Sequence, residues 1–224
     1  MSENRPASFD VRPLVFWPAL ITLGVTLVRL VGELLRWSDR FFNRAAGGAG
    51  AVVGIVWLVP VFGVYFALRL LRAGQSPRST PWSIVGGLLG LVAIPVLALV
   101  WGRLGVPPVA QVLGFCCTFP FVAWGVGRGW PALARVLFAY GMAARIPVIL
   151  IMLLAILGGW GTHYELGRPD LPPLEPPLLK WFVIGLVPQL GFWVSFTVVG
   201  GTFFGGLAAL VRRRASRTVS HAAA

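Results

Sequence analysis

The stretch TLGVTLVRLVGELLRWSDR, residues 22–40, places a periodic line of polar side chains in an otherwise apolar segment. These side chains follow one another at alternating spacings of four and three residues: Thr22, Thr26, Arg29, Glu33, Arg36 and Arg40. At 100° per residue, they fall within an arc of about 80° on a helix. A helix face that carries charge is poorly suited to face lipid. We therefore expect this face to pack against protein, supplied by this chain or by a second polypeptide, or to border a cavity.

The composition outside this stretch is that of a membrane protein. Hydrophobic residues make up 57% of the chain and charged residues 12%, whereas soluble domains carry about 25% charged residues. Apolar stretches long enough to cross a bilayer recur along the sequence, which indicates a polytopic membrane protein. The net charge of +12 does not indicate nucleic-acid binding, because the arginines lie between the apolar blocks and form no patch with aromatic residues. It is better explained as a topology signal and as attraction to anionic lipid headgroups.

We predict an all-α fold, with about six transmembrane helices forming one bundle and one domain. Tryptophans about 30 Å apart along a helix bracket two of the spans, at Trp17/Trp37 and Trp82/Trp101. The predicted spans are residues 14–36, 49–71, 82–101, 109–126, 132–160 and 181–211. They leave a polar N-terminal segment (1–13), a proline-rich loop (161–179) and a basic tail (212–224) that we expect to be disordered.

The fifth span is longer than a bilayer requires. Residues 132–160 would form about 43 Å of helix. It is either one tilted or kinked helix, or two pieces divided at Arg145-Ile146-Pro147. The first piece would be weakly amphipathic, so we favour the single helix.

Six spans place both termini on one side of the membrane. Eleven basic residues then fall on the terminal side and six on the other. The excess predicts that both termini are cytoplasmic, and we expect the protein in a bacterial inner membrane. We expect anionic lipid to contact the basic tail at Arg212, Arg213, Arg214 and Arg217.

Three ionisable residues are predicted to lie within the membrane. Glu33 has Arg29 four residues before it and Arg36 three residues after it, so either can be its partner. Arg145 is a third candidate, and a Glu33–Arg145 pair would close the first span against the fifth. Such groups can form an ion or proton site. Alternatively, the arginines reach towards water and orient the first span.

A second group, His163, Tyr164 and Glu165, follows the fifth span on the outer side. It can act in acid–base chemistry or in contact with a partner or headgroup. One histidine beside one glutamate falls short of a zinc site, and we predict no metal site. Cys116 and Cys117 are expected to be small apolar residues in a packed helix. Glycine pairs at GxxxG spacing, including Gly86/Gly90 and Gly201/Gly205, favour close helix packing.

The sequence indicates a membrane protein more clearly than an activity, and it points to no particular cofactor. Our leading hypothesis is a non-catalytic packing or assembly subunit that uses the polar face of the first span to contact itself or a larger membrane complex. The first alternative is a small transporter or channel whose path is lined by Glu33, Arg29 and Arg145. The second is a lipid-acting membrane enzyme with His163 and Glu165 at the outer face.

Overall fold

The computed structural model describes residues 9–46 and 51–222, which form helices and connecting turns without strands. Within these residues, five helical segments are long and apolar enough to cross a membrane. They are α1 (Arg12–Leu34), α3 (Thr80–Arg103), α4 (Pro108–Gly127), α5 (Pro131–Gly158) and the continuous stretch Pro177–Ala215. A sixth helix, α2 (Leu58–Arg72), is shorter. The predicted polytopic helical bundle is confirmed.

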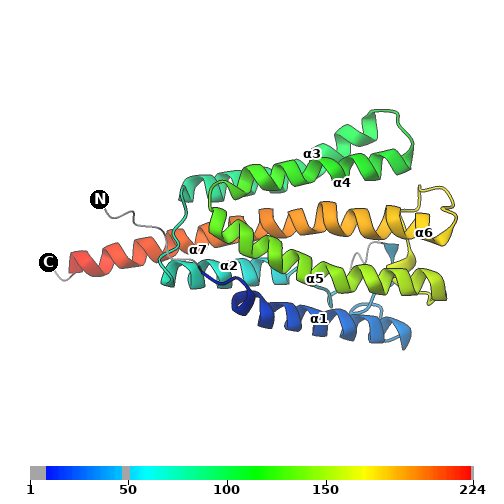
Figure 1. The fold of residues 1–224 in the computed structure, drawn as a ribbon, viewed down its shortest axis with the longest axis horizontal. Helices are drawn as coiled ribbons and strands as arrows, with labels where there is room; N and C mark the ends of the chain where they lie inside the picture. The colour runs from blue at the N-terminus through cyan, green and yellow to red at the C-terminus, as the bar shows by residue number, and fades with distance from the viewer. Residues whose placement is uncertain (1–8, 47–50, 223–224) are drawn as a thin grey trace.

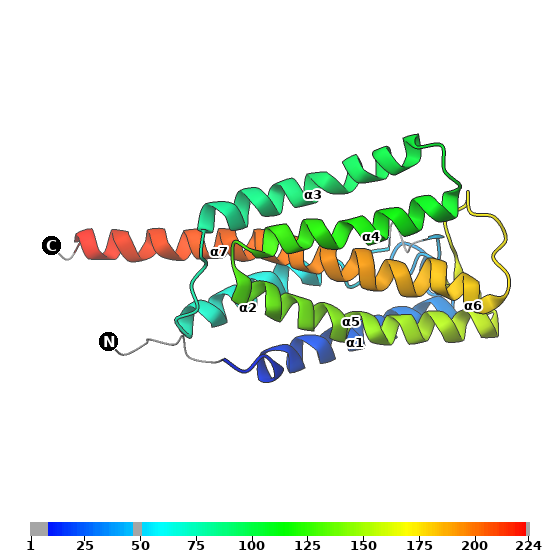
Figure 2. The ribbon, with the colours of Figure 1, turned by 45° about the horizontal axis from the view of Figure 1, so that its top comes forward.

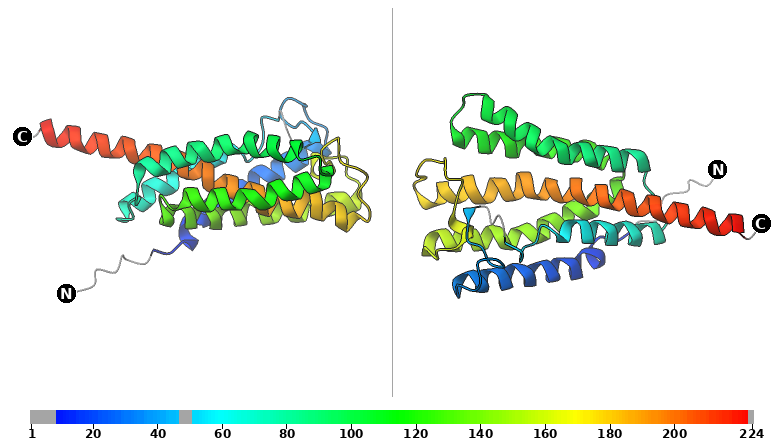
Figure 3. Two further views of the ribbon diagram at one scale, coloured as in Figure 1. Left: turned by 90° about the horizontal axis from the view of Figure 1, so that it is seen from above. Right: turned by 180° about the vertical axis from the view of Figure 1, so that it is seen from behind.

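The last helical stretch forms the centre of the bundle. It begins as α6 (Pro177–Lys180), continues through the π-helical segments η3 (Trp181–Leu186) and η4 (Pro188–Trp193), and ends as α7 (Val194–Ala222). The helix α7 packs against α2, α3, α4 and α5, and Figure 1 shows it between the α3–α4 pair and the remaining helices. The view from behind in Figure 3 agrees. The helix α1 lies at the edge and contacts mainly α5.

The two ends of the bundle differ in character. We call the end at which α1 begins and α7 ends the terminal end, and the opposite end, where the chain passes from α5 to α6, the loop end (Figure 2). The loop end also holds the irregular chain between α1 and α2. A short 3₁₀ turn, η2 (His163–Glu165), lies there as well.

Proline sets where several of these helices begin. A proline stands in the first turn of α1, α3, α4 and α5, where its missing N–H leaves no helical hydrogen bond unmade. The N-cap of α3 adds a side-chain bond, because the Ser79 hydroxyl accepts from the Trp82 amide at 3.1 Å. The helix α5 ends at Gly159, whose φ of 58° lies in the left-handed region that glycine adopts most easily.

The second predicted span is corrected in its bounds. We expected a helix over residues 49–71, but α2 begins at Leu58 and the chain from 51 to 57 is irregular. A proline ring inside a helix clashes with the carbonyl four residues earlier. By starting at Leu58, α2 keeps Pro60 in its first turn, so Val56 does not have to be helical. Residues 47–50, including Gly50, lie outside the described residues.

Two further expectations concern the helix bounds. The helix α5 runs unbroken through Arg145-Ile146-Pro147, as in the single-helix alternative. The helix α7 continues to Ala222, through residues of the tail for which we expected disorder. Apolar and small residues pack the preceding turns of α7 against its neighbours, and the arginines that follow extend the same helix beyond the bundle.

The terminal half is held together by close backbone contacts. A Cβ added at Gly63 in α2 would lie 2.7 Å from the Cα of Gly201 in α7, so the two helices touch there without side chains between them. One added at Gly205 would lie 2.6 Å from a methyl group of Leu133. Fully buried aromatic and aliphatic side chains, including Phe66, fill the space around these contacts. The close packing expected from the GxxxG spacing of Gly201 and Gly205 is present.

Candidate functional site

The polar face of α1 is buried within the chain, against α5 and η2. Thr22, Thr26, Arg29 and Glu33 are all at most 8% exposed. The Thr22 hydroxyl lies 2.7 Å from the Tyr140 hydroxyl of α5. The chain itself therefore supplies the protein surface that this face requires. Two members of the predicted face, Arg36 and Arg40, follow the end of α1 and are exposed.

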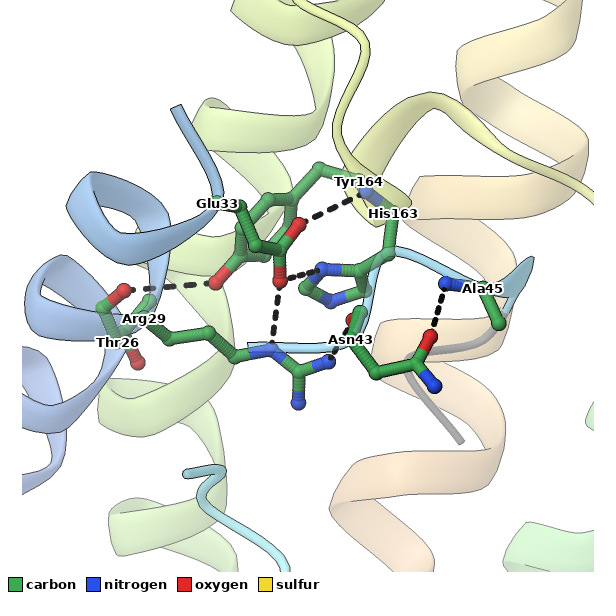
Figure 4. A network of polar contacts seen from close by, with 7 residues as sticks. All are labelled: Thr26, Arg29, Glu33, Asn43, Ala45, His163 and Tyr164. Atoms are coloured by element: carbon green, nitrogen blue, oxygen red, sulfur yellow. Dashed lines mark hydrogen bonds and ion pairs between the residues drawn. The ribbon is translucent and has the colours of Figure 1, made fainter. Parts of the chain in front are cut away.

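The Glu33 carboxylate is the centre of a hydrogen-bond network at the loop end (Figure 4). The Arg29 guanidinium donates from Nε to Glu33 Oε1 at 2.8 Å. The His163 backbone N–H donates to Glu33 Oε2 at 2.9 Å, and His163 Nδ1 lies 2.6 Å from Glu33 Oε1. Arg29 also donates to the carbonyl of Asn43 at 3.1 Å. Both carboxylate oxygens are therefore engaged, by α1 itself and by the loop after α5.

This network shows which of the three partners predicted for Glu33 from the sequence it contacts. Glu33 is paired with Arg29, as one alternative had it, and neither Arg36 nor Arg145 forms the other ion pair. The second partner is His163, which lies 130 residues away along the chain. Gly159 and Gly161, both with positive φ, turn the chain back from the end of α5 towards α1 and so bring His163 to Glu33. Sequence spacing carries no signal for such a distant contact.

The other members of the loop group divide between two environments. The His163 and Tyr164 rings lie 3.9 Å apart, and the Tyr164 hydroxyl points to the carbonyl of Thr26 on α1 at 3.5 Å. Glu165 instead accepts a hydrogen bond from the Gly161 N–H in its own loop. The structure therefore joins His163 and Tyr164 to the α1 network and leaves Glu165 outside it.

The charge state of His163 follows from its burial. Desolvation lowers the pKa of the imidazole below its ordinary value, even though the hydrogen bond to Glu33 acts in the opposite direction. Arg29 lowers the pKa further. The ring is therefore neutral at pH 7, and Nδ1 carries the proton that Glu33 accepts.

Arg145 occupies a separate environment near the middle of α5. Its side chain is buried, donates from Nη1 to Gln189 Oε1 at 3.2 Å and stacks over the Trp193 ring at 4.6 Å. Gln189 and Trp193 both belong to η4, whose wide π-helical turns follow Pro188. π-helical turns inside helices are frequent at functional sites. Arg145 Nε is buried without a hydrogen-bond partner.

A cavity of about 510 Å³ joins these two environments. Its wall is formed by α1, α3, α4, α5, η2, η3 and η4, together with the irregular chain before α2 and the loop after η2. Most of the lining is apolar or aromatic, as at Trp101, Phe115 and Phe192. Its ionisable members are Arg29, Arg145, His163, Tyr164, Arg168 and the thiol of Cys116. Three residues were predicted from the sequence to line a transport path. Arg29 and Arg145 line the cavity, and Glu33 lies behind its wall.

The remaining sequence candidates lie away from the cavity or take a minor part in it. Arg212, Arg213 and Arg214 are exposed on α7 at the terminal end, and their contact with anionic headgroups stays a prediction. The side chain of Arg217 lies outside the described residues. Cys116 is buried, Cys117 is exposed, and neither forms a disulfide. Among residues 9–46 and 51–222, no three His, Cys, Asp or Glu side chains are grouped to hold a metal ion.

Comparison with known proteins identifies a relative that is a membrane protein. No family model matches the chain, and no solved structure matches it. The chain is 29% identical, over 212 residues, to a protein of Rhizorhabdus wittichii named Na⁺/H⁺ antiporter NhaA. The match covers 81% of this chain and 55% of the relative, so the chain spans about half the length of the curated relative it matches. Together with the apolar helices, this similarity establishes an integral membrane protein.

Proposed function

We propose that this protein is a small solute transporter of a bacterial inner membrane. The observation that carries the proposal is the cavity at the loop end, which reaches Arg145 near mid-membrane and borders the Arg29–Glu33–His163 network. Buried ionisable groups around a cavity within a membrane typically mark a solute or ion pathway. The similarity to a protein named as an antiporter supports the same conclusion.

The structure gives less support to our leading sequence hypothesis of an assembly subunit. That hypothesis required the polar face of α1 to contact a second polypeptide. Thr22, Arg29 and Glu33 find their partners within this chain instead. The faces of α1 and α3 that remain exposed are apolar, with side chains such as Leu27 and Leu89, and are suited to lipid.

The geometry also gives less support to a lipid-acting enzyme. His163 and Glu165 are adjacent in sequence, but Glu165 bonds to Gly161 while His163 bonds to Glu33. A general acid–base pair needs both groups within reach of the same reacting atoms.

The Glu33–His163 contact is suited to couple transport to protons. It fastens the loop after α5 to α1 at the side of the cavity. Protonation of Glu33 removes the charge that balances Arg29 and weakens the acceptor for both His163 N–H groups. This event weakens the contact and frees the loop from α1. In this cycle, binding of solute and loss of the Glu33–His163 contact occur in the same conformational step.

The orientation belongs to the same proposal. The arginine-rich terminal end faces the cytoplasm, and the loop end with its cavity faces the outside. In this orientation the observed conformation gives the outer side access to Arg145, and a second conformation has to open towards the terminal end.

Reconstituted protein tests the proposal directly. Proteoliposomes with entrapped pyranine report internal pH, and an oxonol dye reports membrane potential. Gradients of NaCl, KCl and sodium naphthalene-2-sulfonate are imposed in turn. We expect at least one gradient to drive a protein-dependent signal that Glu33→Gln abolishes. Arg103→Gln, at an exposed arginine at the end of α3, serves as the matched charge control. Absence of any protein-dependent signal with all three salts would contradict the proposed function.

A further inference from the structure

The charges around the cavity are unequally balanced, and this imbalance indicates what the cavity binds. Arg29 is paired with Glu33 at 2.8 Å, and Arg168 donates from Nε to Asp170 at 2.9 Å. Arg145 has no carboxylate within ion-pair distance among the residues that the structure describes. Among the three arginines that line the cavity, the one near the middle of its helix is therefore the one without an ion-pair partner.

A buried arginine without an acid is costly unless something compensates its charge. Gln189 supplies one neutral acceptor, and the Trp193 ring supplies a cation–π contact at 4.6 Å. Neither neutralises the charge, and Nε remains without a partner. A compensating charge has to come from outside the chain, through the cavity that Arg145 lines.

The shape and lining of the cavity restrict that ligand. A volume of about 510 Å³ falls in the usual range for small organic ligands, about 300–1,000 Å³. The walls near Arg145 are aromatic and apolar, including Phe192 and Met152. A hydrated inorganic ion gains nothing from such walls, whereas an apolar organic body does. No Asp or Glu belongs to the described lining, so a small metal cation finds no carboxylate on the wall itself.

We propose that the cavity binds an organic anion with an oxyanion head and an apolar body, and that Arg145 holds the head. The inference rests on the proposed function and names the substrate class for the same cavity. The guanidinium of Arg145 is planar and suits a carboxylate or sulfonate group. Gln189 Nε2, whose present acceptor is the Met152 sulfur at 3.6 Å, is placed to donate to the same head. The body of the anion then lies against Phe192 and Trp193.

Equilibrium binding tests this assignment without requiring transport. The full-length protein is placed in nanodiscs of zwitterionic phosphatidylcholine, and naphthalene-2-sulfonate is titrated by calorimetry at pH 7.5. Naphthalene-2-sulfonamide, which is neutral at this pH and nearly isosteric, is titrated in parallel. We expect the sulfonate to bind about tenfold or more tightly than the sulfonamide, since hydrogen bonds to charged groups exceed neutral ones by that much. Equal affinity for the two compounds would overturn the proposal.

Variants locate the effect at Arg145. Arg145→Gln is expected to lower sulfonate affinity about tenfold or more and to leave sulfonamide affinity within about twofold of the wild type. Arg145→Lys keeps the charge without the planar guanidinium group and should give an intermediate sulfonate affinity.

The matched control is Arg128→Gln, because Arg128 also stacks over a tryptophan, Trp124, at 5.1 Å but lies outside the cavity lining. Loss of both ligands together in Arg145→Gln would instead make Arg145 a structural residue. If that variant does not fold, the wild-type comparison and Arg145→Lys decide.

A free organic acid and an anionic lipid present the same oxyanion chemistry, and two lipid compositions distinguish them. In nanodiscs that contain phosphatidylglycerol, a lipid occupant would block the sulfonate and would remain bound in native mass spectra of the wild type but not of Arg145→Gln. Unchanged sulfonate binding would identify a free acid. Tight, Arg145-dependent binding without vesicle flux would disprove transport and keep the anion site. Flux of NaCl without sulfonate discrimination would keep transport and disprove the anion site.

Discussion

The terminal half and the loop half of the bundle are built in opposite ways. In the terminal half, α2 and α7 meet backbone to backbone at Gly63 and Gly201, and the surrounding side chains are apolar and fully buried. In the loop half, the chain before α2 is irregular, the central helix is π-helical, and three arginines stand in the mostly apolar wall of a cavity of about 510 Å³. The same central helical stretch passes through both halves.

The difference separates what stabilises the fold from what acts on a ligand. Close packing gives dispersion contacts to every buried group and leaves no room for a solute. A cavity gives up such contacts and exposes polar groups to whatever enters. Irregular backbone at membrane depth is tolerated where it is buried in protein or lines a cavity, and residues 54–56 do line it. Helix shifts in the proposed transport cycle are therefore expected in the loop half, with the terminal half as the fixed part.

Substitution of a glycine at the α2–α7 contact should produce the largest effect. In Gly63→Val, the new side chain would meet the backbone of Gly201, which cannot move aside by rotating a bond. We expect a loss of about 3 kcal/mol or more, or a fall in Tm of about 10 °C. Gly24→Val is the matched control, because a Cβ at Gly24 has no atom within 4 Å. Thermal unfolding in detergent measures both. Equal stability of the two variants would show that the terminal half is not the rigid part.

Removing the Glu33 charge should have a smaller effect on stability and a larger effect on function. Glu33→Gln leaves Arg29 without its ion-pair partner, and we expect a loss of about 1–3 kcal/mol, because Arg29 lies close enough to the loop end to reach water. Transport should fall to the background level. Adding Arg29→Gln to Glu33→Gln should restore part of the stability and none of the transport. Recovery of transport in the double variant would contradict a direct role for the pair.

The sequence predicted the scaffold better than the cavity. Helical periodicity, tryptophan spacing and the proline positions are local signals, and they located five long helices within a few residues. The α1 stripe correctly indicated a buried polar face. Local signals also mislead. The apolar composition of residues 49–57 favoured a helix, but Pro60 disfavours helix before Leu58, and residues 54–56 are part of the cavity wall instead.

The cavity depends on contacts that sequence spacing does not encode. Arg29 and Glu33 were found because they lie on one helix at i, i+4. The Glu33–His163 contact joins residues 130 positions apart, and the Arg145–Gln189 contact joins helices that meet only in the folded bundle. Gln189 and Trp193 carry no recognisable motif. The missing counterion of Arg145 was the one available signal, since the sequence holds one acid within the predicted spans.

Acidification should weaken the loop half selectively. Burial lowers the pKa of His163 in the folded protein, so between the ordinary imidazole pKa and this lowered value the unfolded chain binds more protons than the folded one. The contribution of neutral His163 to the free energy of unfolding is therefore complete above the ordinary imidazole pKa, and it is lost as the pH falls through this interval. We expect Tm to fall by about 2–4 °C between pH 7.5 and 5.5, as measured by unfolding in detergent. His163→Asn, which keeps an N–H donor and does not titrate, should show a smaller fall. A larger fall in the variant would contradict the assignment.

The smallest expected effect lies where the two halves meet, at the contact between Thr22 and Tyr140. The two hydroxyls lie 2.7 Å apart, and the Thr22 hydroxyl also donates to the carbonyl of Pro18 at 2.8 Å, so the Tyr140 hydroxyl is the donor between them. Thr22→Val removes this acceptor at constant volume. Hydrogen bonds between membrane helices contribute about 0.6 kcal/mol on average, so Tm should fall by about 2 °C.

Thr26→Val is the control, because the Thr26 hydroxyl donates to the carbonyl of Thr22 within α1. Tyr140→Phe should produce the loss by which Thr22→Val exceeds this control, and combining Tyr140→Phe with Thr22→Val should add little, since both remove the same bond between α1 and α5. Full additivity would mean that the two hydroxyls act separately, and α1 would then be held to α5 chiefly by the charged network at the loop end.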